Sequence, residues 1–267
     1  MLYGLYQSAQ GAAANQRELE VVANNMANAG TTGFKRDLAI AGHYRPHEEN
    51  GLGGLPSMLD LPGLSPFDLG SALARMTGGN ALAATAIDLS QGSMNETGGD
   101  LDVALAGPGF FQVESDGETV LTRNGRFTRN AEGVLVTVDG GRPVLGVGGG
   151  ELTIPPGTNR IGITPDGTVS AGFEDGTNYE LGKLAVVVPT DPTSLVKRGD
   201  GELVSSGTEP ADPRQTSVQQ GFVEGSGVDS VKETMSLIAA SRGFETNVNL
   251  VKLQDETLGR LLSAARP

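Results

Sequence analysis

Two histidines and two glutamates in the first fifty residues are the side chains best suited to bind a metal ion. His43 and His47 lie four residues apart and are followed by Glu48 and Glu49, so a helix there would bring both imidazoles to one face. Pro46 stands between the histidines and would break such a helix. We therefore interpret this stretch as an exposed linker and expect no metal site.

The glycine-rich run at 146–151 is the nearest approach to a phosphate-binding loop. It lacks the lysine of a P-loop and leads into Leu152-Thr-Ile-Pro instead of a helix. The run is better interpreted as a turn, and we expect no cofactor-binding residues.

Two further patterns would suit an anionic ligand or a glycoside. Arg123, Arg126 and Arg129 flank an Asn124-Gly125 turn, but at strand spacing we expect a solvated face. Among the 32 acidic residues no pair stands out for glycoside hydrolysis. The chain also has no Trp and no Cys, which leaves no indole to stack on a sugar and excludes thiolate catalysis. We predict no catalytic residues, and the protein is not expected to be an enzyme.

The charge of the chain is concentrated in its middle. Residues 1–36 carry Arg17, Lys35 and Arg36 against Glu18 and Glu20, and residues 228–267 carry equal numbers of basic and acidic side chains. The body between them therefore holds the whole excess, −14 against a total of −13. Neutral ends can lie close to copies of themselves, whereas an acidic body is unsuited to nucleic acid. We expect no nucleic-acid partner.

No segment approaches the eighteen or so consecutive apolar residues of a membrane span, so no membrane insertion is expected. The first twenty residues also lack the basic and continuous apolar regions of a cleavable secretory signal. Any export would need another route.

Both ends of the chain carry apolar residues at heptad spacing, which predicts helices that present a stripe to other helices. The N-terminal stripe is Leu5, Ala12, Leu19 and Met26, and the C-terminal one is Leu237, Phe244, Val251 and Leu258. Core stripes of a hairpin within one subunit would give the same pattern. Polar residues near the C-terminal stripe favour a multi-helix environment.

The helix ends are predicted from capping residues. The first helix is expected over 2–28, stopped by a left-handed cap at Asn28 and Gly30, with Phe34 as an anchor after it. The second is expected to begin at Ser226, with Asp229 three residues on, and to continue toward Ala264.

Between the helices the sequence predicts an antiparallel β domain. Short apolar strands alternate with turns at Asp116-Gly117, Asn124-Gly125, Asp139-Gly140 and Asp166-Gly167. The expected fold is therefore α+β: N- and C-terminal heptad helices that pair as a coiled-coil-like tube domain, and a central antiparallel all-β domain. The expected domains are an N-terminal helical domain at 1–42, a Gly/Pro-rich linker at 43–84, the β domain at 85–221, and a C-terminal helical domain at 222–267 that packs with 1–42.

Several segments, taken together, resemble a known family. Val22-Ala-Asn-Asn-Met-Ala-Asn-Ala-Gly-Thr-Thr-Gly-Phe-Lys-Arg36 is similar to the N-terminal signature of flagellar basal-body rod and hook proteins. Agreement continues, in order, at Gln91-Gly-Ser-Met-Asn-Glu-Thr-Gly, Leu101-Asp-Val-Ala-Leu, Gly109-Phe-Phe, Leu121-Thr-Arg-Asn-Gly-Arg-Phe and Val218-Gln-Gln-Gly-Phe-Val-Glu-Gly-Ser. Within the family the chain resembles the proximal and distal rod subunits, and leans to the proximal type at Leu135-Val-Thr and Arg142-Pro-Val-Leu-Gly.

The resemblance implies a structural subunit of the rod, the periplasmic drive shaft and export channel of the flagellum. Its partners would be copies of itself, other rod and hook axial proteins, and the type III export apparatus. Assembly contacts are expected at the two heptad stripes and at Asn24, Asn25, Asn28, Gly33 and Phe34. Gly227 stands where the family usually carries Asn, and Arg242-Gly-Phe-Glu replaces the usual Arg-Ala-Tyr-Glu, which weakens the helix there.

Two other hypotheses remain open from the sequence. One is a β-rich surface binding module or adhesin whose terminal helices pair within one molecule. The other is a cell-wall hydrolase that accompanies the rod.

Overall fold

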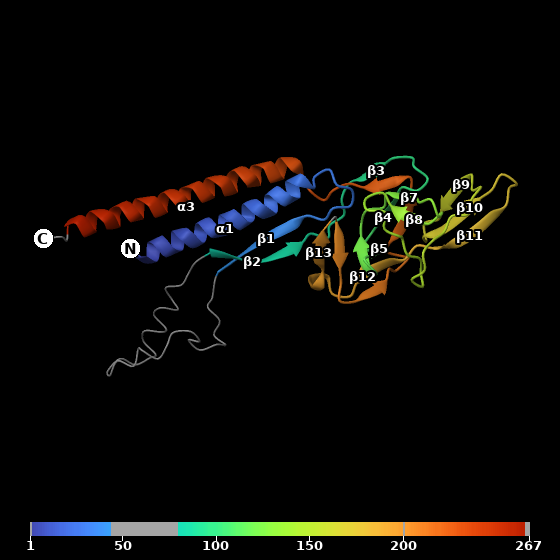
Figure 1. The fold of residues 1–267 in the computed structure, drawn as a ribbon, viewed down its shortest axis with the longest axis horizontal. Helices are drawn as coiled ribbons and strands as arrows, with labels where there is room; N and C mark the ends of the chain where they lie inside the picture. Colours follow the sequence, from blue (N-terminus) through green and yellow to red (C-terminus); the bar gives the residue numbers. More distant parts are fainter. Residues whose placement is uncertain (1, 44–79, 200, 265–267) are drawn as a thin grey trace, which may run out of the picture. The chain divides into compact units, whose positions relative to one another are not determined.

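The structure is a computed structural model that describes residues 2–43, 80–199 and 201–264. It divides into two compact units, each described by itself below (Figure 1). The helical unit holds Met1–Asn24, Asp37–Ala86 and Val231–Pro267, and the β unit holds Asn25–Arg36 and Ile87–Ser230.

The helical unit contains two long helices and one small sheet. Helix α1 covers Leu2–Ala27 and helix α3 covers Ser230–Ala264. The helices run antiparallel and side by side (Figure 1). Strands β1 (Asp37–His43) and β2 (Asn80–Ile87) pair as a two-stranded sheet, so both ends of the expected linker are strands. The rest of that linker, including His47, lies outside the described residues.

The end of α1 agrees with the expected position to one residue, but its cap differs. Neither Asn28 nor Gly30 has a positive φ, and the left-handed residue is Gly33, with a φ of 69°. The chain instead leaves the helix through tight turns, in which Asn28 N donates to Asn25 O and Ala29 N donates to Met26 O. The predicted left-handed cap was therefore wrong in position.

Helix α3 begins four residues later than expected. Ser226 does not cap it, because the Ser226 hydroxyl donates to Asn28 O at 2.9 Å and Gly227 N donates to Phe34 O at 2.8 Å. Ser226 and Gly227 therefore bind the segment after α1, which lies in the same β unit, and helical backbone starts only at Ser230.

The β unit is built entirely of antiparallel pairs. Its largest sheet has the strand order β13-β14-β6-β5-β12-β15, and a second sheet has the order β11-β10-β9. Three smaller sheets pair β16 with β4, β17 with β3, and β7 with β8. The strands are β3 (Met94–Glu96), β4 (Val103–Ala106), β5 (Phe110–Ser115), β6 (Glu118–Thr122), β7 (Phe127–Arg129), β8 (Leu135–Thr137), β9 (Arg160–Ile163), β10 (Thr168–Gly172), β11 (Asn178–Lys183), β12 (Val186–Pro189), β13 (Val196–Gly199), β14 (Glu202–Val204), β15 (Thr208–Pro210), β16 (Ser217–Gln220) and β17 (Phe222–Glu224). A short 3₁₀ helix, η1, covers Pro192–Ser194.

The main core of this unit joins strands from most of these sheets. Phe111 and Phe127 meet edge to face, with ring centroids 5.2 Å apart, among buried Val, Leu and Ile side chains. Alternate residues of β5 point inward, which is the period-2 pattern that the sequence showed. The core therefore forms where the short apolar runs were predicted to be strands.

Of the four predicted turns, three are confirmed and one is corrected: Gly140 and Gly167 have positive φ in turns, as expected at Asp139-Gly140 and Asp166-Gly167. Asp116 and Gly117 both have positive φ and connect β5 to β6 as a two-residue hairpin turn. Asn124-Gly125 is not such a turn: Gly125 O accepts from Val103 N, and a Cβ on Gly125 would lie 1.6 Å from Val103 O. Gly125 is needed there for close approach of two backbone segments, and not for a left-handed turn.

The two units also divide the chain differently from the expected domains. Residues 25–36 belong to the β unit, although they begin with the last three residues of α1. Phe222–Glu224 forms β17 and pairs with β3, so this stretch is strand and not part of a C-terminal helical domain. Backbone pairing with the β unit decides both assignments.

Candidate functional site

A buried group of three charged side chains lies in the β unit, and we call it the Glu224 cluster: Lys35, Arg123 and Glu224. Lys35 Nζ donates to Glu224 Oε1 at 2.8 Å, and Arg123 Nε donates to Glu224 Oε2. All three side chains are at most 4% exposed. The described structure thus places one carboxylate between two cations away from water.

All three guanidinium nitrogens of Arg123 donate hydrogen bonds. Its Nη1 donates to Gly109 O, and its Nη2 donates to Leu105 O at 3.0 Å and to Gly107 O at 2.6 Å. The expectation that Arg123 belongs to a solvated face was therefore wrong. Its guanidinium fork donates to three backbone carbonyls and one carboxylate at once, a geometry that lysine cannot supply.

The cluster is where the segments of the family resemblance meet. Glu224 ends β17, Lys35 follows α1 by eight residues, and Arg123 directly follows β6. Gly92 N also donates to Glu224 Oε1 at 2.9 Å, and the Gln91 amide bridges Leu105 O and Gly107 N. Segments that resembled the family one by one are thus parts of one structural unit.

The turn at Gly33 and Phe34 fixes the segment after α1 to the same place. Gly33 N donates to Glu224 O at 2.8 Å, and a Cβ on Gly33 would lie 2.4 Å from the carbonyl carbon of Arg123. Phe34 is 4% exposed, and Lys197 Nζ lies 4.0 Å from its ring centroid in a cation–π contact. Gly33 and Phe34, both expected as assembly residues, lie within the β unit of their own chain.

The electrostatics of the cluster favour a positioning role. Burial lowers the pKa of Lys35, while the hydrogen bond and the charge of Glu224 oppose that shift. Nearby, the hydrogen bonds from Ser90 lower the pKa of the Asp88 carboxyl. The described residues contain no His, Cys, Asp and Glu group placed to hold a metal ion. The cluster can hold chain segments together, and its two cations and one carboxylate leave it a net charge of +1.

The predicted heptad residues lie at half-buried positions in both helices. These are Leu5, Ala12, Leu19 and Met26 on α1, and Leu237, Phe244, Val251 and Leu258 on α3. Of the predicted asparagines, Asn24 is exposed and Asn25 is 1% exposed. Asn28 is half-buried; its backbone carbonyl accepts from Ser226 and its side-chain oxygen from Thr31.

Contacts between α1 and α3 also involve residues outside the predicted set. A Cβ on Gly4 would lie 2.9 Å from Gln254 Nε2, one on Gly11 would lie 2.9 Å from Asn247 Nδ2, and one on Gly243 would lie 2.6 Å from Asn15 Nδ2. On α1 the contact positions are 4, 11 and 15, and on α3 they are 254, 247 and 243. Both sets are separated by seven and then four residues, so each contact pairs a glycine with a side-chain amide at the intervals of a heptad repeat. Sequence reasoning missed this line because it followed apolar residues, although Gly4 and Gly11 repeat at the same interval.

Helix α3 also exposes apolar side chains. Val231, Met235 and Leu253 are 58–66% exposed, and Ile238, Leu250 and Leu261 are 42–50% exposed. None of the described helices has a stretch long and apolar enough to cross a lipid bilayer. Within the described part of the helical unit, pairing with α1 therefore leaves much of the apolar surface of α3 in contact with water.

Comparison with known proteins shows three family matches along the chain and relatives that cover most of it. Residues 5–35 match the family "Flagella basal body rod protein", residues 104–171 match "Flagellar hook protein FlgE/F/G D1 domain", and residues 219–264 match "Flagellar basal body rod FlgEFG protein C-terminal". Over 246 residues the chain is 36% identical to flagellar basal-body rod protein FlgF of Caulobacter vibrioides, covering 91% of this chain and 88% of that protein. The chain belongs to the flagellar basal-body rod protein family.

Two relatives named FlgG support the same assignment. The Agrobacterium fabrum protein is 34% identical and covers 93% of this chain and 94% of its own, and the Bacillus subtilis protein is 30% identical over the full length of both. This rod family is one of structural flagellar proteins and not of enzymes. The Glu224 cluster is accordingly a structural element of a rod-type β unit.

Proposed function

We propose that this chain is a structural subunit of the bacterial flagellar basal-body rod, which polymerises through its terminal helices into the periplasmic drive shaft and export channel. The observation that carries the proposal is the apolar surface of the helices. The heptad residues are only half-buried, and α3 exposes six further large apolar side chains. A subunit that buries these side chains against neighbouring helices gains the hydrophobic free energy that the isolated chain lacks.

In this proposal α1 and α3 pair as a coiled-coil-like unit, and several such pairs surround a central tube. The partners are other copies of the chain and other flagellar rod and hook axial proteins. Contacts that do not close into a ring generate a helical tube. The subunit reaches the periplasm through the flagellar type III export apparatus, without a cleavable signal peptide.

The alternative of a β-rich surface adhesin has less support. Its helices would pair only within one molecule, and the apolar side chains that α3 exposes would have no role. The three relatives described above, which match along most of the chain, are rod proteins.

The experiment places a charge on each helix and measures assembly. Leu19→Glu and Phe244→Glu should each abolish incorporation into isolated basal bodies and motility, because a carboxylate cannot be buried between apolar helices at little cost. The β unit should stay folded, with unchanged protease resistance.

The matched control is Val147→Glu, which introduces the same charge in the β unit at a position whose side chain is 70% exposed. This variant should assemble normally. Full incorporation and normal motility of Leu19→Glu or Phe244→Glu would reject helix-mediated assembly.

A further inference from the structure

An open cleft of about 360 Å³ lies beside the Glu224 cluster in the β unit. Its walls combine apolar and proline side chains with two cations, and include Lys35, Leu89, Pro108, Phe110, Arg123 and Pro192. Pro108 and Pro192 are exposed at its rim. The cleft therefore offers an apolar surface whose floor is positively charged.

The surroundings of the cleft carry a positive charge within an acidic body. Lys35, Arg36, Arg123 and Lys197 gather near Asp88 and Glu224, an excess of two positive charges. Two acidic residues lie near its edge, Asp191 next to Pro192 and Glu209 opposite Val188 of the lining, so the positive excess is confined to the floor. Lys35 uses two of its three N–H donors, toward Ser90 O and Glu224 Oε1. A ligand with both apolar and acidic groups matches this site.

The tip of the β10–β11 hairpin has the complementary character. Residues 174–180 are exposed, and Glu174, Asp175 and Glu180 give the tip three negative charges with no basic residue until Lys183. Tyr179 is 58% exposed and meets Phe173 edge to face, with ring centroids 5.6 Å apart. The tip therefore presents a fixed aromatic ring among carboxylates.

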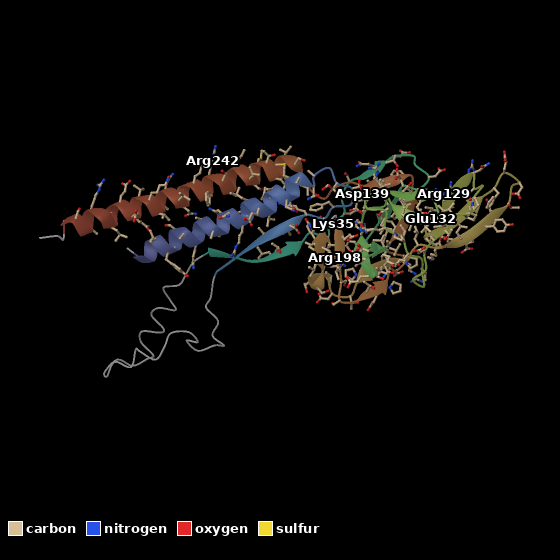
Figure 2. All side chains as sticks on the ribbon, in the orientation of Figure 1. Lys35, Arg129, Glu132, Asp139, Arg198 and Arg242 are labelled. Atoms are coloured by element: carbon tan, nitrogen blue, oxygen red, sulfur yellow. The ribbon has the colours of Figure 1, made fainter. Side chains whose placement is uncertain are left out.

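The tip and the cleft belong to opposite ends of the β unit. In Figure 1 the β9–β11 sheet lies at one end of this unit, and in Figure 2 Lys35 and Arg198 lie at the other. The tip of one molecule is thus remote from its own cleft, and it could reach such a cleft only on another molecule.

We propose that the acidic β10–β11 tip of one copy docks in the Lys35 cleft of the next copy. This inference rests on the proposed function, because it adds a head-to-tail contact between β units to the contacts between helices. Such a contact is heterologous and does not close on itself, so it extends a filament. Opposite charges give it orientation, and Tyr179 with the proline walls supplies apolar contact.

A second cleft in the β unit provides an internal comparison. It has a volume of about 290 Å³ and is also lined by prolines, among them Pro213, but its charged residues Asp166 and Lys183 balance each other. Charge complementarity therefore selects the Lys35 cleft for the acidic tip.

Because the chain has no cysteine, cross-linking tests the contact directly. The variant Asn178→Cys/Pro108→Cys, in basal bodies isolated from cells, should give a ladder of multimers with a short bis-maleimide. Either single variant, and the control Asn178→Cys/Pro213→Cys, should give monomers only. Incorporation of the Asn178→Cys/Pro108→Cys protein without a ladder, or a ladder with Pro213→Cys instead, would overturn the proposed contact. Absence of the unaltered chain from basal bodies would instead reject the proposed function.

A charge cycle tests the same contact without cross-linking. Glu174→Lys/Glu180→Lys should reduce incorporation about tenfold, as expected for a loss near 1.4 kcal/mol. The matched control Glu132→Lys/Glu151→Lys changes the net charge equally at exposed positions outside the tip and outside both clefts, and should incorporate normally.

A change at the cleft completes the cycle. Pro108→Glu should lower incorporation of the unaltered chain but raise that of the tip-reversed chain, Glu174→Lys/Glu180→Lys, whereas Pro213→Glu should do neither. Equal effects of Pro108→Glu in both backgrounds would contradict the docking.

Discussion

Glu224 shows how a single carboxylate can hold segments that are far apart in the sequence. It binds Lys35 and Arg123, which are 189 and 101 residues away along the chain, and its own backbone carbonyl accepts from Gly33 N. A buried carboxylate between two buried cations is costly to remove, because the remaining charges lose their counter-ion inside a low-dielectric interior.

We therefore expect Glu224→Gln to destabilise the β unit by about 3–5 kcal/mol. The control Glu118→Gln removes the exposed partner of Arg198, where the two side chains are 69% and 39% exposed, and should cost less than about 1 kcal/mol. Urea unfolding followed by far-ultraviolet circular dichroism measures both. Similar small losses in the two variants would mean that the cluster contributes no more than a surface ion pair.

For the Glu224 cluster, the sequence identified the segments that contain the three residues but did not predict their contact. The resemblance drew attention to each of the segments that contain Lys35, Arg123 and Glu224. It could not bring them together, because ion pairing between distant segments follows from the fold and leaves no local spacing. Arg123 was assigned to a solvated face for that reason: three arginines at strand-like intervals do not reveal that one of them turns inward to three carbonyls.

Among the elements, those with local signals were predicted best. Helix α1 was expected over 2–28 and covers Leu2–Ala27, and the Asp116-Gly117 hairpin was predicted from its turn residues. The start of α3 and the cap of α1 were misplaced. At both places the backbone groups bind partners distant in sequence, as Ser226 does with Asn28 and Gly33 does with Glu224, so local capping rules do not decide the geometry.

Gly33 and Gly30 provide a matched test of this turn. Gly33→Ala should destabilise the β unit by about 2–4 kcal/mol, because φ is 69° and the added Cβ would meet the backbone of Arg123 and Asn124. Gly30→Ala should change stability by no more than about 0.5 kcal/mol, because no atom lies within 4 Å of the added Cβ. Thermal unfolding of both variants checks the difference. Equal melting temperatures would show that the turn can move away from Arg123.

At the scale of the whole molecule, the two units differ in how they are stabilised. The β unit has a contiguous apolar core and an internal ion cluster, so it carries its stability within one chain. The helical unit brings glycines against amides between α1 and α3, and apart from Val22 most of its described large apolar side chains are half-buried or exposed. Its helices therefore gain little hydrophobic free energy from each other, and we expect them to depend on neighbours.

Hydrogen exchange on the isolated full chain tests this division. Amides of 2–24 and 231–264 should exchange with opening free energies of about 1–2 kcal/mol, near the low end for folded proteins, whereas core strands of the β unit such as β5 and β6 should approach the global value. Gly259→Ala should slow exchange in α3 only slightly, since its added Cβ meets no atom within 4 Å and improves helix propensity alone. In isolated basal bodies the same helices should become strongly protected. Slow exchange of the helices in the free chain would instead show that α1 and α3 form a self-sufficient pair, and would favour a subunit whose helices are complete before assembly.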